Sequence, residues 1–254
     1  MSQEVSLLSN HIQMIGTGNM FAKNFYNNNA IIHTENFRIL IDCGFTAARS
    51  LHQIGMNMND IDGILITHIH SDHVGGLEEF AFQMNFIHQR KPKLYVPVTI
   101  VDTLWEKTLC GALYDPHNGY HSLNNYFDVI EIQEGTPIVI DNNFTIELFR
   151  TVHIKGKPSY ALLINENLFY SSDMIFDPDL LQFIVAKGRC KHIFHECQLT
   201  GVGEVHTTLA QLLTLPETIQ DKIKLMHYND DMESFIGRTG RMQFAEQYRM
   251  YTLD

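Results

Sequence analysis

The sequence predicts one α/β domain in which helices cover the outer faces of two β-sheets. Short runs of aliphatic and β-branched residues alternate with helical stretches and turn signals over the whole chain. The chain has 254 residues, of which 44% are hydrophobic, so it is long enough to bury a sizeable core. Because no low-complexity linker divides it, we expect a single domain over residues 1–254.

The first half of the chain is expected to be rich in strands. Ile61 to Thr67 is an aliphatic run typical of a buried strand. In order, we expect strands at residues 11–16, 30–33, 37–42 and 61–67, helices at 46–54 and 77–88, and a loop at 68–76.

The second half of the chain is expected to show the same alternation of strands and helices, with one polar insertion between the strands. The stretch 113–127 contains Pro116 and Gly119, which predict a loop or lid. Its rings could stack on a single base or could equally belong to an ordinary surface loop. They are the rings of Tyr114, His117, Tyr120, His121 and Tyr126. We expect strands at 93–96, 129–132, 144–151, 160–164, 168–171, 192–195 and 224–227, and helices at 207–214 and 240–248.

The charge balance argues against stable binding of long nucleic acid. The formal net charge is −11, with 18 Lys and Arg against 29 Asp and Glu, and no basic run is present. Gripping a polynucleotide requires clustered cations that neutralise its phosphates. A small anion can still bind where a metal ion supplies the positive charge. We therefore expect a small or compact substrate.

Other features of composition point to a reduced cytoplasmic protein. No apolar run approaches 18 residues, and the polar segment 1–10 lacks the pattern of a signal peptide, so neither a membrane span nor export is expected. None of the four cysteines forms a CxxC pair, and we expect reduced, mostly buried thiols at Cys43, Cys110, Cys190 and Cys197.

A dense cluster of possible metal ligands follows the strand expected at 61–67. The order is His68-x-His70-x-Asp72-His73. Two histidines separated by one residue point into one pocket when the loop curls, and the Asp-His pair then reaches an adjacent position. Imidazoles combined with a carboxylate suit a borderline divalent ion. Four such side chains within six residues make an ordinary polar loop a poor explanation.

This motif resembles the HxHxDH signature of the metallo-β-lactamase superfamily. The resemblance runs over nearly the full length and includes the turn 15–18 and the strand-ending Asp42. It implies the fold of that superfamily, an αββα sandwich of two mixed sheets with helices on the outer faces. It also implies further ligands at strand ends, and the matching positions are Thr151-Val152-His153, Ser171-Ser172-Asp173 and Leu225-Met226-His227.

The resemblance implies two divalent ions, with zinc as the default and manganese as an alternative. One ion would be held by His68, His70 and His153, and the other by Asp72, His73 and His227. Asp173 would bridge the two ions, and Asp42 would orient a ligand histidine. The histidines outside this pattern are expected to be structural, and they are His11, His33, His52, His88 and His192.

The C-terminal third resembles the RNase Z branch of the superfamily. In that branch, two characteristic segments precede the last metal ligand. The matching runs here are Phe194-His195-Glu196-Cys197-Gln198 and Val205-His206-Thr207-Thr208. This likeness implies that Glu196 and His206 protonate a leaving group, which phosphodiester cleavage needs. Asp72 is the third expected catalytic residue, because it would orient the attacking hydroxide. The ordinary alternatives are a helix N-cap or a salt bridge for Glu196, and for His206 capping of the helix that Thr207 begins.

In its compact length and its Phe-His-Glu-Cys-Gln run, the chain resembles the members of a smaller group, the cyclic-nucleotide phosphodiesterases of the anti-Pycsar type. That likeness implies hydrolysis of 3′,5′-cyclic mononucleotides to 5′-monophosphates, evasion of cyclic-nucleotide defence signalling, and a homodimer in the host cytoplasm.

Three alternatives remain at this point. An RNase Z-like tRNA 3′-endonuclease would be expected to carry a basic substrate-gripping arm, which the sequence lacks. A lactonase or β-lactamase would not need Glu196 and His206. A nucleotide-binding protein without turnover would not need a seven-ligand site.

Overall fold

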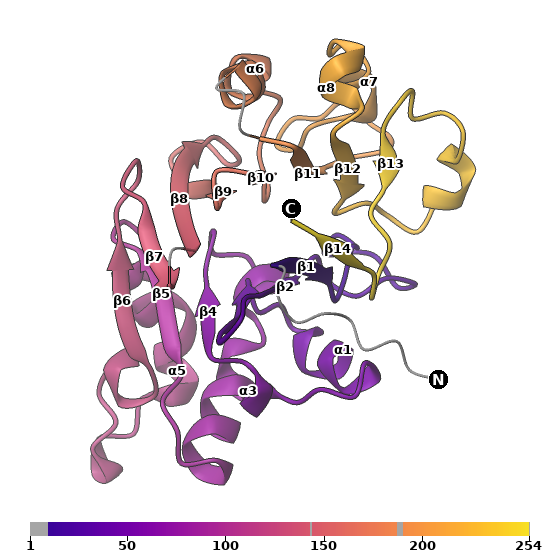
Figure 1. The fold of residues 1–254 in the computed structure, drawn as a ribbon. Coiled ribbons are helices and arrows are strands. Elements are labelled where there is room, and N and C mark those ends of the chain that lie inside the picture. The colour runs from indigo at the N-terminus through magenta and orange to yellow at the C-terminus, as the bar shows by residue number, and fades with distance from the viewer. Residues whose placement is uncertain (1–9, 143, 187–189, 254) are drawn as a thin grey trace.

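The computed structural model describes residues 10–142, 144–186 and 190–253. Over these residues, two seven-stranded sheets form the centre of the molecule. In Figure 1, α1 (Ala47–Gln53) and α3 (Leu77–Phe82) lie outside the first sheet, and α6 (Pro178–Ala186), α7 (Leu209–Leu212) and α8 (Glu217–Gln220) lie outside the second. The predicted α/β class with two sheets and outer helices is confirmed.

The first sheet has the strand order β14-β1-β2-β3-β4-β5-β6. Its strands are β1 (His11–Met14), β2 (Ala30–His33), β3 (Arg38–Ile41), β4 (Gly63–Leu65), β5 (Lys93–Pro97), β6 (Asp128–Ile132) and β14 (Met250–Thr252).

The second sheet has the order β13-β12-β11-β10-β9-β8-β7. Its strands are β7 (Ile138–Asp141), β8 (Phe144–Thr151), β9 (Ser159–Ile164), β10 (Leu168–Tyr170), β11 (His192–Glu196), β12 (Ile223–Met226) and β13 (Gln243–Phe244).

Strand β9 shows why the second sheet is buried on both faces. Successive side chains of a strand point to opposite faces. Tyr160, Leu162 and Ile164 accordingly join the core between the sheets. Ala161 and Leu163 pack instead into a second core beneath the outer helices. All six residues of β9 are buried, which explains its continuous apolar run.

The strand directions bring many strand ends to one edge of the sandwich. Strands β3, β4 and β5 are parallel to one another. Strands β10, β11 and β12 are also parallel to one another. Because β8 and β10 both run antiparallel to β9, β8 points in the same direction as β10. The carboxyl ends within each group therefore lie at a common edge, where ligands usually bind in such sheets.

Several local predictions need correction. The helix expected at 240–248 is wrong, because this segment supplies β13 and leads into β14. Strand β13 completes the edge of the second sheet beside β12, and β14, which follows the segment, completes the edge of the first sheet beside β1. This pairing overrides local helical preference. The loop expected at 68–76 contains the short helix α2 (Ser71–Val74).

Several elements of the fold were not predicted from the sequence. Among them are β7, α6, α8 and a helical segment at 101–113, which consists of α4 (Val101–Leu104), a π-helical turn (Trp105–Leu109) and α5 (Cys110–Leu113). The helix expected at 77–88 is present, but it changes from α3 to a π-helical turn at Gln83–Ile87.

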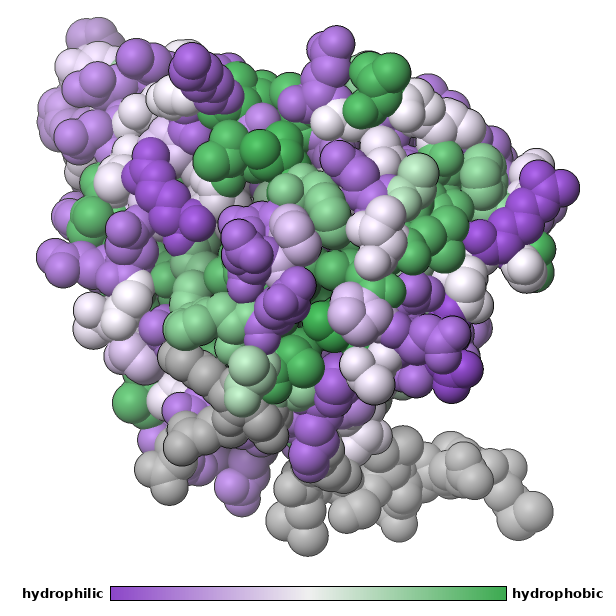
Figure 2. Space-filling view, turned by 90° about the horizontal axis from the view of Figure 1, so that it is seen from above, coloured by the Kyte–Doolittle hydropathy of each residue, from purple (hydrophilic) through white to green (hydrophobic). Residues whose placement is uncertain are grey.

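The polarity of the surface and the state of the cysteines are as expected from the composition. Hydrophilic and hydrophobic side chains are interspersed over the face shown in Figure 2. Within the described ranges, no helix is long and apolar enough to cross a membrane. All four cysteines are free thiols, and three of them are buried.

The larger hydrophobic core can be tested with Leu40, which belongs to it and is fully buried in β3. Leu40→Ala should lower the free energy of unfolding by about 2–5 kcal/mol, because the truncation leaves a cavity in a packed core. Guanidinium unfolding followed by circular dichroism measures this change. Val139→Ala is the control, since Val139 is 63% exposed on β7. Equal losses in the two variants would contradict the described packing.

Candidate metal centre

The seven predicted ligands come from the carboxyl ends of four strands. His68 and His70 lie in the loop after β4, and Asp72 and His73 lie in α2, which that loop enters. His153 follows β8, Asp173 follows β10 and His227 follows β12. Segments far apart in the sequence thus contribute to one place because the strand ends share an edge.

Left-handed backbone conformations turn the chain sharply after β10 and β12, and also at Asp42, which directly follows β3. The φ angles are 59° at Asp42, 50° at Ser172 and 56° at His227. Non-glycine residues rarely adopt positive φ, and such strain concentrates at functional sites. These residues lie within or directly beside the predicted site. Because strained conformations persist only where the surrounding structure imposes them, packing of the two sheets holds the geometry of the site.

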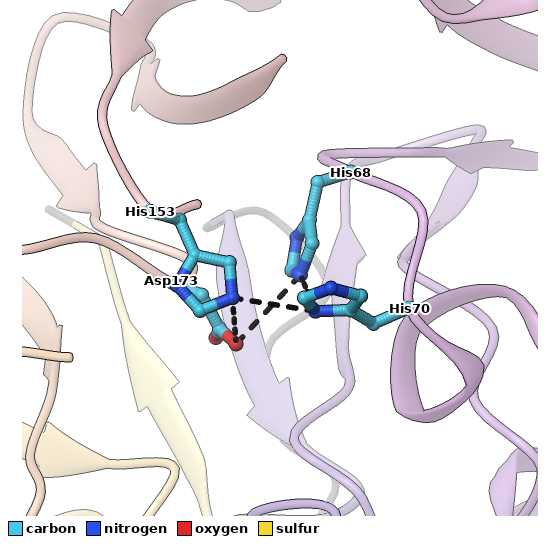
Figure 3. Close-up of side chains that lie close together, drawn as sticks. All are labelled: His68, His70, His153 and Asp173. Carbon is cyan, nitrogen blue, oxygen red and sulfur yellow. Dashed lines mark hydrogen bonds and ion pairs between the residues drawn. The ribbon is translucent and has the colours of Figure 1, made fainter. Parts of the chain in front are cut away.

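The Oδ2 atom of Asp173 lies at the centre of the cluster. Its distances to ring nitrogens are 3.4 Å for His73 Nε2 and 3.4 Å for His227 Nε2. The corresponding distances are 3.7 Å to His68 Nε2 and 3.9 Å to His153 Nε2. Figure 3 shows the rings of His68, His70 and His153 pointing toward one another and toward Asp173. One buried carboxylate oxygen is therefore surrounded by imidazole nitrogens at distances too long for good hydrogen bonds.

Two ligand sets share this carboxylate. In each set, one ligand atom per residue lies within 4.8 Å of all the others. The first set is His68, His70, His153 and Asp173, and the second is Asp72, His73, Asp173 and His227. The structure therefore brings together all seven residues in the grouping implied by the resemblance.

Orphaned polar atoms show that the cluster fits cations. Among the described residues, no hydrogen-bond partner reaches the buried atoms Asp72 Oδ1, Asp173 Oδ1 or His73 Nε2. A buried polar atom without a partner is costly, whereas coordination of a divalent ion would satisfy it. The mixed nitrogen and carboxylate donors suit zinc or another first-row divalent ion.

A third set combines Asp173, Glu196, His206 and His227. Both oxygens of Glu196 already accept hydrogen bonds. Oε1 accepts one from the Met174 amide at 2.6 Å, and Oε2 accepts one from His206 at 2.7 Å. Glu196 is therefore better suited to positioning its neighbours than to binding a metal.

Hydrogen bonds fix the orientation of two ligand rings. The Nδ1 atom of His73 donates to Asp42 Oδ2 at 2.7 Å, which turns its Nε2 atom into the cluster. Asp42 is itself held by the amide and hydroxyl of Thr67. His153 donates from Nδ1 to the carbonyl oxygen of Val205 at 2.6 Å. Such partners fix the tautomer and direction of metal-binding histidines, as predicted for Asp42.

The electrostatics divide the histidines into two classes. Burial lowers the pKa of His68 well below its ordinary value and that of His70 to about 4, so both rings are neutral. Burial also opposes charge on His227, but Asp173, Asp72 and Glu196 outweigh it and raise its pKa to about 10. In the same way, Asp173, Asp42 and Asp72 raise the pKa of His73. The buried carboxylates thus favour the protonated forms of His73 and His227, and a bound metal ion would replace those protons.

Glu196 and His206 form a buried pair beside the cluster. The side chain of Glu196 is fully buried, whereas that of His206 is 26% exposed. Burial opposes charge on both groups, but their mutual hydrogen bond outweighs it. The pair therefore has a raised His206 pKa and a lowered Glu196 pKa. The partly exposed ring can present a proton to a molecule in the adjoining cavity.

Two cavities meet at the cluster, and both are lined by His70, His153 and Ile154. The first, of about 390 Å³, extends to the helical segment 101–113 and includes Lys107 and Lys157. The second, of about 430 Å³, contains Asp72, Asp173, Glu196, His206 and His227. It also reaches the segment Asn19-Met20-Phe21, which was not predicted from the sequence to be part of the site.

The predicted lid takes no part in the lining of these two cavities. None of the residues 113–127 lines either one. Tyr126 is buried and stacks on Tyr120 with ring centroids 4.9 Å apart. At least these two rings therefore serve packing rather than stacking on a ligand within this chain. The five histidines expected to be structural lie outside all three ligand sets found among the described residues.

Relatives with a shared name match almost the whole chain. Residues 10–251 match the family described as anti-Pycsar protein Apyc1. The anti-Pycsar protein Apyc1 of Paenibacillus sp. (strain J14) is 54% identical over 242 residues, covering 95% of this chain and 98% of that protein. The protein of that name from Bacillus phage BSP38 is 42% identical over 259 residues, covering 97% and 100%.

Solved structures share the fold at low sequence identity. The metallo-β-lactamase fold protein YhfI from Bacillus subtilis has a TM-score of 0.73 at 17% identity, covering 96% of this chain and 99% of that one. Human tRNase Z, short form, has a TM-score of 0.66 at 16% identity, covering 96% and 99%. These likenesses confirm the metallo-β-lactamase fold, and the sequence matches show that the chain belongs to the anti-Pycsar protein Apyc1 family.

Proposed function

We propose that this protein is a two-metal phosphodiesterase that hydrolyses 3′,5′-cyclic mononucleotides to 5′-monophosphates. The observation that carries the proposal is the single Asp173 oxygen shared by two sets of nitrogen and carboxylate donors. Membership of the anti-Pycsar family and the metallo-β-lactamase fold make the chain a metal-dependent hydrolase. The nature of the substrate and the number and identity of the ions belong to the proposal.

Seven side chains would hold the ions in this proposal. They are His68, His70, Asp72, His73, His153, Asp173 and His227. Two divalent ions bound there would neutralise a phosphodiester and lower the pKa of a water molecule. Zinc is the default for this donor set, with manganese as the alternative.

The remaining chemistry belongs to residues of the chain. Asp72 and Asp173 are buried among the ligand residues. In this proposal their carboxylates orient the attacking water toward phosphorus. His206 donates a proton to the departing 3′ oxygen, and Glu196 holds the imidazole in position by accepting from Nδ1. An alkoxide leaves poorly without such a proton.

Size and charge favour a small nucleotide. The second cavity measures about 430 Å³, within the usual range for sites that enclose a small ligand. Lys107 and Lys157 add positive charge beside the cluster in a chain whose net charge is −11. Two local lysines can attract one phosphate group, but they do not form the basic surface that a tRNA precursor requires. The homodimer implied by the resemblance stays a prediction, and light scattering on purified protein tests it.

A substrate panel tests the proposal directly. The metal-loaded protein should hydrolyse cyclic mononucleotides faster than a tRNA precursor, a lactone or a β-lactam, measured as product formed per unit time by chromatography. Preferred cleavage of the tRNA precursor, with a steep dependence of binding on salt, would instead favour the endonuclease activity. Tight nucleotide binding without product would favour a binding protein.

The metal cluster is tested by His68→Ala combined with His70→Ala. Loss of two donors from the first set should reduce bound metal, measured by elemental analysis, and abolish detectable hydrolysis of a cyclic mononucleotide. His52→Ala is the matched control, because His52 is exposed on α1 and belongs to none of the three ligand sets. Full activity in the double variant would refute the proposed site.

The proton donor is tested by His206→Ala. We expect kcat to fall by roughly 10²–10⁴-fold while metal content is unchanged, because a general acid contributes about that much. Val202→Ala is the control, since Val202 is 82% exposed in the same segment. Loss of metal in the His206 variant would mean that His206 is a ligand instead.

A pH profile of kcat separates the roles of this pair. Because the His206 pKa is raised, the ring keeps its proton above the ordinary histidine pKa, and kcat should fall as pH rises through the raised value. Glu196→Gln removes the negative charge that raises this pKa, so the same fall should begin at lower pH. An unchanged profile in Glu196→Gln would contradict the assigned pairing.

A further inference from the structure

Phe21 places an exposed aromatic ring at the second cavity. Its side chain is 73% exposed, and it belongs to neither hydrophobic core of the described residues. It nevertheless lines the cavity that contains His206 and His227. An apolar ring that contributes nothing to the core but borders the site is suited to contact a ligand.

Hydrogen bonds hold the segment that carries this ring. The amide of Asn19 donates to the carbonyl oxygen of Tyr228 at 3.0 Å. The Asp230 carboxylate accepts from the amide of Lys23 at 2.9 and 3.0 Å and from the amide of Asn24 at 2.9 Å. Between these anchors, the side chain of Asn19 accepts from the amides of Phe21 and Ala22.

Both anchors lie next to the metal cluster in the sequence. Tyr228 directly follows His227, the last predicted ligand, and Asp230 comes two residues after Tyr228. The segment 19–24 is therefore tied to the chain that positions His227, and the ring has a defined place relative to the cluster. A binding group held in this way loses little conformational freedom when its ligand arrives.

The chemistry of the cavity identifies the part of the ligand that Phe21 would contact. A nucleotide phosphate belongs at the cluster, among the ligand residues and His206. Because the proposed proton donor His206 lines the second cavity and not the first, we place the nucleoside in the remainder of the second cavity. The lining there includes Phe21 and the amide-bearing residues Asn19, Gln198 and Asn229. A nucleobase is planar and stacks on an aromatic ring, and amides can bond to its edge.

We propose that Phe21 stacks on the nucleobase of the substrate and that Asp230 is a positioning residue that holds the stacking segment in place. This inference rests on the proposed cyclic-nucleotide activity. Phe21 contributes to substrate binding and leaves the reacting phosphate to the metal cluster. Since every base has a flat face, stacking of this kind applies to purines and pyrimidines alike.

The experiment compares two substrates of the metal-loaded protein. One is a 3′,5′-cyclic mononucleotide, and the other is the same cyclic ribose phosphate without a base. Phe21→Ala should raise KM for the nucleotide about tenfold or more and change kcat by less than about threefold. For the substrate without a base, KM should stay the same. Phe21→Tyr should retain the wild-type KM, whereas Phe21→Leu, which is apolar but not aromatic, should not.

Asp230 is tested on the same pair of substrates. Asp230→Ala should raise KM for the nucleotide alone, and Asp230→Asn, whose amide oxygen still accepts hydrogen bonds, should raise it less. Phe86→Ala is the matched control, because Phe86 is 60% exposed and lines neither cavity at the cluster. It should affect both substrates equally or not at all.

The outcomes separate this inference from the proposed function. An unchanged nucleotide KM in Phe21→Ala, or equal changes for the two substrates, would overturn the stacking role while leaving the phosphodiesterase activity intact. Absence of hydrolysis of either substrate by the wild-type protein would overturn the proposed function and, with it, this inference.

Discussion

The site depends on the convergence of imidazole nitrogens around one buried carboxylate oxygen, Asp173 Oδ2. Distances of 3.4–3.9 Å are too long for good hydrogen bonds, and Asp173 Oδ1 has no partner among the described residues. Protein cores tolerate few such unsatisfied groups. Cations shared by the surrounding donors would remove this cost. The burial that makes the cluster costly without metal is therefore the same property that would make it bind metal.

The two-sheet architecture provides this convergence. Parallel strands in each sheet end at one edge, and packing of the sheets brings the edges together. Left-handed turns at Asp42, Ser172 and His227 then direct side chains inward immediately after the strands end. A core on both faces of the second sheet supports these strained turns. Stability is thus concentrated in the sheets, and the chemistry is placed in the short loops that leave them.

Much of the site could be predicted from the sequence because its signal is local. Four candidate ligands within six residues, and three more at the ends of apolar runs, are visible without a structure. The C-terminal strands β13 and β14 could not be predicted, because each is very short and forms only by completing the edge of a distant partner. The role of Phe21 was equally hidden, since it depends on hydrogen bonds that link residues 19–24 to residues 228–230.

The most direct test of the central claim is hydrolysis of a 3′,5′-cyclic mononucleotide by metal-loaded protein in ¹⁸O-labelled water, with the product analysed by mass spectrometry and ³¹P NMR. Metal-dependent attack of water on phosphorus should give a 5′-monophosphate with a single ¹⁸O atom in its phosphate group, and product should be lost when the metal is removed by a chelator. A 3′-monophosphate, or turnover that persists in metal-free protein, would contradict it.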